Sequence, residues 1–312
     1  IVNHFKRPLL LKLVLQKDGS YLSEKVIANG KIGFGITTFD YDNISFNKNG
    51  VFKVASFSNE VPSFMYEFNS YAFDEMRYIN ALIDYSKYKK TQQRVQQLFM
   101  KNKYGLGIIK ADENNGIIAV VPNWSTMYRV EVSDYFGNKS TVSIPIQYDL
   151  LSTIVPQETV TSNYFVSADK DTNFSKENMS AFFAAGTFYN DFDMNFDVKN
   201  DTLYLHEDTV PAHTNFTISI EDNKFTEEQR EKVFIGILTG KKVGYNATSR
   251  KGNILSTKVK TLGKYTLVMD TIAPTISIIQ PIEGKWISDQ KTIQLRINDA
   301  LSGIKSYNGY LN

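Results

Sequence analysis

Three histidines are the residues of this chain whose chemistry could supply a metal site. They are His4, His206 and His213. A zinc site needs three or four ligands that converge on one point. His206 is followed directly by Glu207 and Asp208, but adjacent side chains on a strand point to opposite faces. Pro211 places a turn between His206 and His213. The spacing therefore predicts solvated or turn histidines and no metal site. We also predict no catalytic residue and no cofactor in this region.

Two acidic segments could in principle supply calcium ligands. The run 169–173 resembles the start of a calcium loop, but Phe174 stands where that loop requires glycine and Ser180 where it requires a bidentate glutamate. The second segment, Asn298-Asp299 followed by Ser302-Gly303, is typical of a turn. Calcium at a domain junction is the alternative interpretation of that segment.

Several other kinds of chemistry are excluded by what the composition lacks. The chain has no cysteine, so no disulfide, thiolate metal site or cysteine nucleophile is possible. It also lacks a glycine-rich phosphate loop, a Gly-x-Ser-x-Gly motif and a paired-carboxylate signature.

The overall charge and hydropathy give no indication of nucleic-acid binding or of a membrane span. The net charge is +2, from 35 basic and 33 acidic residues, which is too small to favour nucleic acid. No apolar run reaches the length of about 18 residues that predicts a transmembrane helix.

Short alternating strands separated by turn signals dominate the sequence and predict an all-β fold of tandem immunoglobulin-like or β-sandwich domains. We predict a first β-sandwich domain over 1–148, a second over 151–270 and the start of an immunoglobulin-like domain over 271–312. The predicted strands of the first domain include Leu9–Gln16, Tyr21–Ala28, Val51–Phe57, and a hairpin of Tyr128–Ser133 with Ser140–Ile146. Gly33 and Gly35 predict a bulge or a close neighbouring backbone, because glycine otherwise weakens a strand.

One segment, 74–100, has helical periodicity and predicts an insertion between strands. Asp74 can cap a helix that begins at Glu75, and an apolar stripe follows at 76, 79, 82 and 83. The pattern pauses at 86–88 and resumes from Thr91 to Phe99. We therefore expect two short helices that cover a sheet face or edge, with a docking surface for a partner as the alternative role.

Both ends of the chain are predicted to cut through folded modules. An apolar predicted strand begins within the first nine residues, with no separate segment before it that would mark a domain start. Any targeting segment is expected upstream. The alternating run Thr292–Asn298 needs a facing sheet, which 271–312 is too short to supply. We expect the third domain to be incomplete.

Three blocks together resemble a known family. They are 30–36 with 73–85, 248–252 with 262–267, and 270–274 with 286–288 and 302–307. In this order they resemble the region downstream of the catalytic domain in lysostaphin-type (LytM-like) zinc metallopeptidases of Bacteroidota. That family holds zinc with His-x-x-x-Asp and His-x-His motifs, and neither motif occurs here.

The resemblance implies a periplasmic or outer-membrane-associated location and a parent chain that is a peptidoglycan endopeptidase with zinc in an upstream domain. Its implied role for these residues is a non-catalytic accessory region that positions the enzyme or binds other envelope proteins. A scaffold subunit of an outer-membrane complex without a peptidase role is the first alternative. A carbohydrate-binding sandwich that uses Trp124, Tyr128 and Trp286 is the second.

The resemblance also implies modification sites. Envelope proteins of Bacteroidota are O-glycosylated at Asp followed by Ser or Thr and a small or aliphatic residue. This pattern occurs at Thr202, Thr209 and Thr271. We predict these threonines to lie in turns or linkers, where a glycan can be accommodated.

Overall fold

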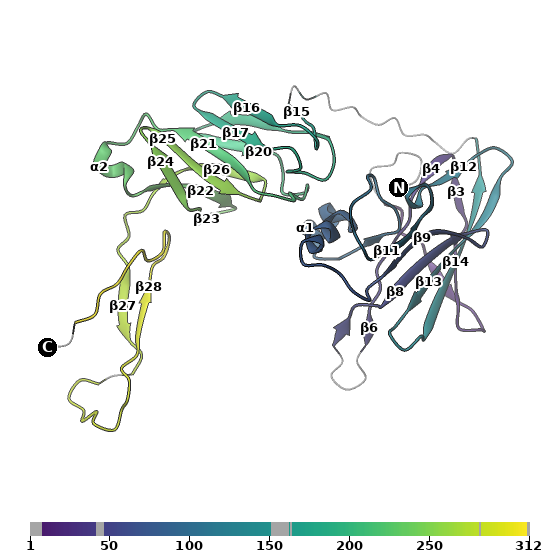
Figure 1. Ribbon diagram of the computed structural model, residues 1–312, viewed down its shortest axis with the longest axis horizontal. Coiled ribbons are helices and arrows are strands. Elements are labelled where there is room, and N and C mark those ends of the chain that lie inside the picture. The colour runs from purple at the N-terminus through teal and green to yellow at the C-terminus, as the bar shows by residue number, and fades with distance from the viewer. Residues whose placement is uncertain (1–7, 42–46, 151–161, 163, 281, 311–312) are drawn as a thin grey trace. The chain divides into compact units, whose positions relative to one another are not determined.

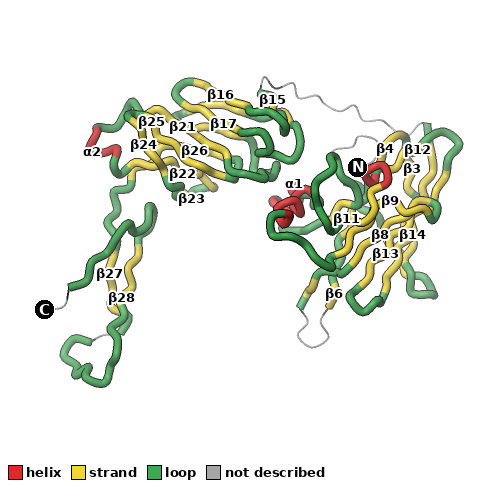
Figure 2. Tube along the Cα trace, viewed as in Figure 1, coloured by secondary structure: helices red, strands yellow, loops and turns green. Residues whose placement is uncertain are grey.

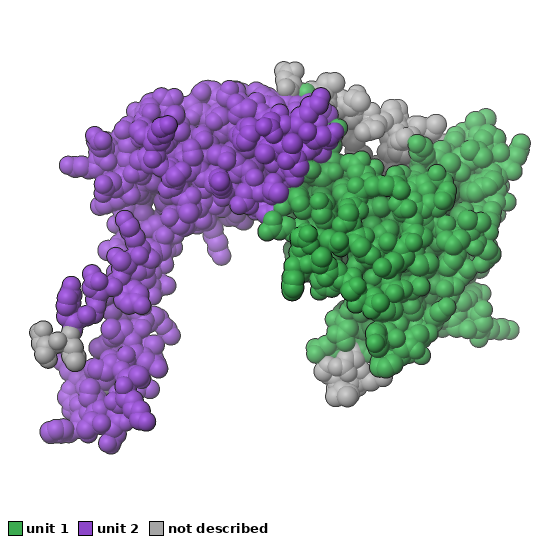
Figure 3. Space-filling model, in the orientation of Figure 1, with its two compact units in different colours: residues 1–163, 188–193, 208–213 green, residues 164–187, 194–207, 214–312 purple. Residues whose placement is uncertain are grey.

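The computed structural model describes residues 8–41, 47–150, 162, 164–280 and 282–310 (Figures 1 and 2). Strands greatly outnumber helices, which confirms the predicted all-β fold. The chain forms two compact units, coloured green and purple in Figure 3. Unit 1 contains 1–163 with the loops 188–193 and 208–213, and unit 2 contains 164–187, 194–207 and 214–312. Each unit is described by itself.

The main element of unit 1 is an eight-stranded sheet with the order β1–β2–β14–β13–β8–β9–β11, in which β3 also pairs with β14. Its strands are β1 Leu13–Leu15, β2 Tyr21–Ser23, β3 Val26–Ala28, β8 Lys53–Ser58, β9 Val61–Glu67, β11 Ile109–Asp112, β13 Ser125–Ser133 and β14 Lys139–Tyr148. The long hairpin of β13 and β14 confirms the predicted hairpin. Strand β14 pairs in parallel with β2 and β3, so β1 lies at one edge of the sheet and β11 at the other.

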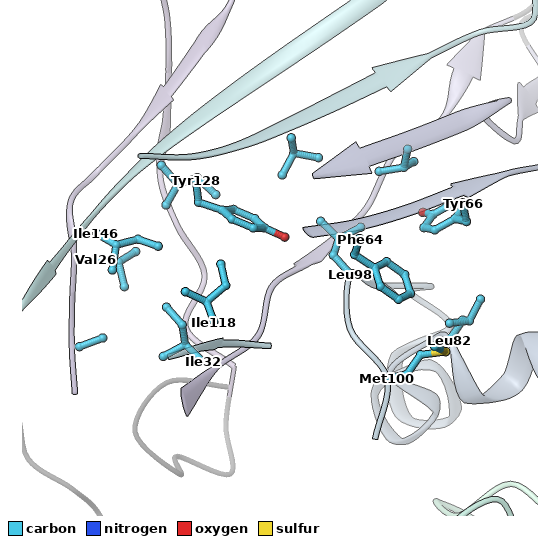
Figure 4. Packing of buried hydrophobic residues seen from close by; sticks show 14 of the residues in the cluster. Val26, Ile32, Phe64, Tyr66, Leu82, Leu98, Met100, Ile118, Tyr128 and Ile146 are labelled. Carbon is cyan, nitrogen blue, oxygen red and sulfur yellow. The ribbon is translucent and has the colours of Figure 1, made fainter. Parts of the chain in front are cut away.

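Three smaller strand pairs also belong to unit 1. They are β4 Gly30–Ile32 with β12 Ile118–Val120, β5 Gly35–Ile36 with β10 Gln96–Gln97, and β6 Asp40–Tyr41 with β7 Lys48–Asn49. The core contains inward side chains of the large sheet, such as Phe64 and Tyr128, packed with Ile32, Leu98 and Ile118 (Figure 4). The core therefore joins the large sheet to the smaller strands and to the helical segment.

The helical segment 74–100 differs from its prediction. A 3-10 helix, η1 Glu75–Ala81, is followed by α1 Tyr85–Thr91, where the sequence predicted a pause. Asp74 makes no capping bond, whereas the Asp84 side chain accepts from the backbone amide of Lys87 at 3.0 Å. The left-handed φ of +62° at Gln92 ends α1. The predicted second helix was wrong because the apolar residues after Gln92 lie on extended chain, where β10 pairs with β5.

Two glycines let the chain around this segment pack closely. A Cβ at Gly116 would lie 2.2 Å from the carbonyl oxygen of Leu98, and the φ of +75° already favours glycine. A Cβ at Gly35 would lie 3.2 Å from the carbonyl oxygen of Gln96 and 2.9 Å from a methyl group of Val95. The close neighbouring backbone that the sequence predicted at Gly35 is confirmed. Gly116 follows β11 within a second 3-10 helix, η2 Glu113–Gly116.

Unit 2 contains two five-stranded antiparallel sheets. The first has the order β16–β17–β21–β25–β24, and the second has the order β19–β20–β26–β22–β23. Their strands are β16 Thr172–Lys176, β17 Met179–Phe183, β19 Phe196–Lys199, β20 Thr202–Leu205, β21 Phe216–Glu221, β22 Val233–Thr239, β23 Lys242–Gly244, β24 Thr248–Lys251, β25 Ile254–Val259 and β26 Gly263–Met269. Alternate residues of β17, β20 and β21 are buried, as the period of a half-buried strand requires. A further short strand of unit 2 is β15 Phe165–Val166, whereas β18 Phe192–Asp193 belongs to unit 1.

A single helical turn, α2 Glu227–Arg230, lies between β21 and β22. Thr226 and Gln229 form a capping box: the Thr226 hydroxyl accepts from the Gln229 amide, and the Gln229 side chain accepts from the Thr226 amide. Two amides at the start of this single turn are thereby satisfied.

The last strands, β27 Thr275–Ile278 and β28 Leu295–Asn298, form a two-stranded antiparallel hairpin. Ile276 is 69% exposed and Leu295 is 54% exposed, so the apolar side chains of the hairpin are open to solvent. Among the described residues, these two strands pair only with each other. The predicted domain limits, and the predicted incompleteness of 271–312, stay predictions.

Candidate functional site: an open apolar strand edge

Strand β1, its neighbour β2 and the two leucines at 9 and 10 before β1 expose apolar side chains. We call this surface the β1 edge; its members are Leu9, Leu10, Leu13, Val14, Leu15, Tyr21 and Leu22. Leu10 is 85% exposed, and Leu13, Val14 and Leu15 are 50%, 61% and 63% exposed. Single exposed apolar residues are ordinary, but a contiguous group of them marks an interaction site.

A tight turn holds β1 and β2 together. Ser20 donates from its backbone amide and its hydroxyl to Oδ1 of Asp18, at 3.0 and 2.7 Å. These bonds from Ser20 hold the pKa of Asp18 below its ordinary value. Gly19 has a φ of +84°, and the Gln16 amide donates to the Ser20 carbonyl at 2.8 Å. This turn fixes the register of β1 on β2.

The pairing of β1 with β2 decides which backbone groups face outward. The Glu24 amide donates to the Lys12 carbonyl, and the Gln16 amide donates to the Ser20 carbonyl. In an antiparallel pair, hydrogen-bonded residues alternate along each strand. Lys12, Val14 and Gln16 therefore direct their backbone groups toward β2. Leu13 and Leu15 direct theirs toward the open side, where the described residues supply no further strand.

Both faces of the β1 edge are apolar. Leu13 and Leu15 lie opposite Ser23 and Tyr21 in register, so these four residues share one face. That face is the core side of the sheet, because Leu11 on the same face packs against the core. Val14 and its partner Leu22 lie on the other face. A partner that adds to this edge therefore meets apolar side chains on both faces.

The opposite edge of the sheet is built differently. Strand β11 has an irregular register between Ile109 and Ala111, and its Lys110 side chain is exposed. Asp112 forms an ion pair with Lys103 at 3.0 Å. Bulges and charges of this kind protect an edge strand from pairing with other chains. The β1–β2 register has neither an irregularity nor a charged residue.

A second surface feature is an open groove of about 690 Å³ on the outer face of β13 and β14. Met127 lies opposite Pro145 and forms part of its lining. Lys25 donates to the Gln147 side chain at 3.1 Å, and the Met127 amide donates to Oδ1 of Asn59 at 3.1 Å. Trp124 lies at the same end of β13 and also contributes to the lining. One cation, several amides and apolar surface thus meet in this groove.

The three aromatic residues predicted for carbohydrate binding differ in their exposure to solvent. Tyr128 is fully buried and stacks on Phe34 with ring centroids 4.3 Å apart, and this burial raises the pKa of its phenol. Tyr128 cannot reach a ligand, so its candidate role was wrong: as an inward residue of β13 it belongs to the core. Trp124 is half-buried and lines the groove of unit 1, whereas Trp286 is 97% exposed and belongs to unit 2.

The histidines lie in separate environments. His206 has a φ of +52°, its Nδ1 accepts from the Asn195 amide at 3.1 Å, and burial lowers its pKa. His213 belongs to the other unit, where its ring stacks on Tyr78 with centroids 4.5 Å apart. His4 lies outside the described residues. Within the part of the chain that the structure describes, no three His, Asp or Glu side chains are grouped to hold a metal.

The two acidic segments form turns. Oδ1 of Asp171 accepts from the Ala185 amide at 2.8 Å, at the start of β16. Oδ1 of Asp299 accepts from the amides of Leu301 and Gly303 at 2.9 and 2.8 Å. The predicted turn at 298–303 is therefore confirmed. Nearby, the Ser302 amide donates to Asp270 at 3.1 Å.

The three predicted glycosylation threonines differ in accessibility. Thr271 is exposed on the segment between β26 and β27. Thr209 is half-buried in a turn. Thr202 is the first residue of β20, is half-buried, and donates to the Asn200 carbonyl at 3.3 Å. Of the three, Thr271 best fits the requirement for an accessible linker.

Sequence comparison relates one part of the chain to a known family. A Zu5-like domain matches residues 163–270, which include both five-stranded sheets of unit 2. No curated protein and no solved structure matches the chain. No helix among the described residues is long and apolar enough to cross a membrane.

Proposed function

We propose that this chain is a non-catalytic, protein-binding region of a cell-envelope protein of the lysostaphin-type metallopeptidase family. The family and the periplasmic or outer-membrane location rest on the sequence resemblance. The binding role rests on one observation, the β1 edge. Its partner is an envelope protein, and its mode of binding is the addition of an extended strand.

The physical argument for strand addition has two parts. Burial of apolar surface contributes about 25 cal/mol per Å², so covering several half-exposed leucines is a substantial driving force. The outward amides and carbonyls of Leu13 and Leu15 can then form ladder hydrogen bonds, which supply affinity in strand addition. The unprotected β1 edge thus combines apolar contact with backbone pairing.

Site-specific photo-crosslinking in the native host tests this proposal. A benzophenone amino acid at position 15 is expected to capture a defined partner. The matched control is position 254, because Ile254 is also apolar and exposed but lies on β25, which is paired on both sides. No capture from position 15 above the level from position 254 would contradict the proposal.

The absence of chemistry in this region is part of the proposal. The purified chain is expected to release no fragments from peptidoglycan, with or without added zinc. Metal-dependent release above a blank would contradict it. The residues that precede Ile1 distinguish the accessory region from the alternative, a scaffold subunit: intact zinc motifs support the former and degraded motifs the latter.

The groove beside Trp124 favours carbohydrate binding as a second candidate function. Aromatic and apolar surface with a few amide groups is a usual composition for small-ligand sites. Titration with soluble peptidoglycan fragments and neutral oligosaccharides, followed by calorimetry, tests this role. Binding by the native chain that is lost in Trp124→Ala, with β13–β14 unchanged by NMR, would support it. No heat with any saccharide would remove this candidate.

A further inference from the structure

We infer that the β1 edge pairs with the β1 edge of a second copy of this chain. The pairing is antiparallel, with a two-fold axis beside Val14. The inference rests on the proposed binding role of the β1 edge and identifies its partner. It follows from the direction of the backbone groups, the pattern of side chains and the difference between the two edges of the sheet.

The backbone geometry permits this pairing. Leu13 and Leu15 face outward, so the Leu13 of one copy can exchange ladder hydrogen bonds with the Leu15 of the other. Val14 then lies opposite its own counterpart, at a non-hydrogen-bonded position. Because Val14 is the middle residue of β1, this register pairs the whole strand.

The side chains are compatible with a second copy. Continuing the same register places Lys12 opposite Gln16, and Leu11 opposite Lys17. No two like charges face each other, which would destabilise an antiparallel pair. The apolar character continues on both faces, since Leu13 meets Leu15 on one face and Val14 meets Val14 on the other. The sequence of β1 is therefore complementary to itself.

The two edges of the sheet favour a closed dimer over an open chain of molecules. Pairing of β1 with β11 of another copy would be heterologous and would build a ring or an open filament. The register irregularity and the charges of β11 oppose that arrangement. Pairing of β1 with β1 uses the same surface twice and closes after two copies. The difference between the two edges of the sheet therefore favours β1–β1 pairing in a two-fold dimer over β1–β11 pairing.

Disulfide trapping on the full chain tests the register. The chain has no cysteine, so a disulfide can form only between the cysteines introduced at the same position of two copies. At a non-hydrogen-bonded antiparallel position the two Cα atoms lie about 4.5 Å apart, within the range that a disulfide bridges. Val14→Cys is expected to give a covalent dimer under mild oxidation. The matched control is Leu22→Cys, which lies on the same face one strand further in and is expected to stay monomeric.

Sedimentation of the unmodified chain completes the test. We expect a concentration-dependent dimer that is lost in Val14→Lys, which places two cations at the two-fold axis. Val14→Lys alters an exposed side chain, and retention of the native circular dichroism spectrum checks that the fold persists. A chain that stays monomeric, together with equal trapping of the two cysteine variants, would overturn the inference. If position 15 then crosslinks to a different protein, the proposed binding function stands and only the second copy is excluded; if it crosslinks to nothing, both fail.

Discussion

Arg230 donates from Nε to Oδ2 of Asp222 at 2.6 Å, and the Asp222 side chain is fully buried. This ion pair joins α2 to the end of β21 in unit 2. Burial raises the pKa of Asp222, but the Lys224 amide and the Arg230 guanidinium outweigh burial and hold the pKa below its ordinary value. The pair therefore anchors the loop between β21 and β22.

Removal of the Asp222 charge is expected to destabilise unit 2. Breaking a buried ion pair from one side costs about 3 kcal/mol, because the remaining charge loses its partner. Asp222→Asn is therefore expected to lower the free energy of unfolding in urea by about this amount. The control is Asp201→Asn, whose ion pair with Lys224 is exposed and is expected to contribute less than about 1 kcal/mol. Equal effects of the two variants would contradict the anchoring role.

The same carboxylate predicts a pH dependence. A group whose pKa is lower in the folded state stabilises the fold fully above its unfolded pKa of about 3.9, and this contribution is lost as the pH falls from there through the lower pKa of the folded state. The native chain is expected to lose more stability between about pH 5 and pH 3 than Asp222→Asn does. Urea unfolding across this range measures the difference. If the free energy of unfolding falls equally with pH in the native chain and in Asp222→Asn, Asp222 does not cause the loss of stability.

The observed helix caps give a prediction at the helical segment. Asp84→Ala is expected to lower the stability of unit 1 by about 1 kcal/mol, because α1 loses the bond to the Lys87 amide. Asp74→Ala serves as the control, since Asp74 makes no capping bond. Thermal unfolding of both variants measures the difference. A larger effect at Asp74 would restore the helix start that the sequence indicated.

The hairpin of β27 and β28 is expected to be the least protected β-structure of unit 2. A two-stranded hairpin with exposed side chains is only marginally stable in water. Amides of Leu295–Asn298 are therefore expected to exchange much faster than those of β21, which is paired on both sides. Hydrogen exchange with residue resolution measures this. Comparable protection in β28 and β21 would mean that other contacts hold the hairpin in solution.

Glycosylation is expected first at Thr271, the most accessible of the three predicted threonines. The intact mass of the protein from its native host is expected to exceed that of the bare polypeptide. Thr271→Ala should reduce the excess by one glycan, whereas Thr202→Ala serves as the comparison at a half-buried strand position. A native mass equal to that of the polypeptide would end this idea.

Local signals made part of the fold predictable. Asp134 with Gly137 and Asn138 marks the turn of the β13–β14 hairpin, and the structure forms it with the Asn138 amide bound to the Asp134 carboxylate at 2.8 Å. The helix positions were harder to predict, because helical spacing of apolar residues between 74 and 100 also suits a segment that packs on the core in extended form. Tertiary packing around Leu98 therefore overrode local periodicity.

The candidate site was only partly accessible to sequence reasoning. The run Leu9–Gln16 indicated a strand, but its partners determine whether an apolar strand is buried or open. One signal was present: Leu13, Val14 and Leu15 are consecutive apolar residues, which gives an apolar strand on both faces. The burial of Tyr128 also followed from sheet pairing, which no single sequence position reveals.

The close approach at Gly116 also determines which substitutions the chain accepts. Any side chain at this position would collide with the Leu98 carbonyl, a backbone atom that cannot rotate away. Gly137, by comparison, has open space around its missing Cβ, although its φ of +89° also favours glycine. In a saturation library screened for folded protein, position 116 should therefore return glycine alone, whereas position 137 should also admit asparagine and aspartate. The contact between the helical segment and the chain at position 116 therefore tolerates almost no amino-acid substitution at that position.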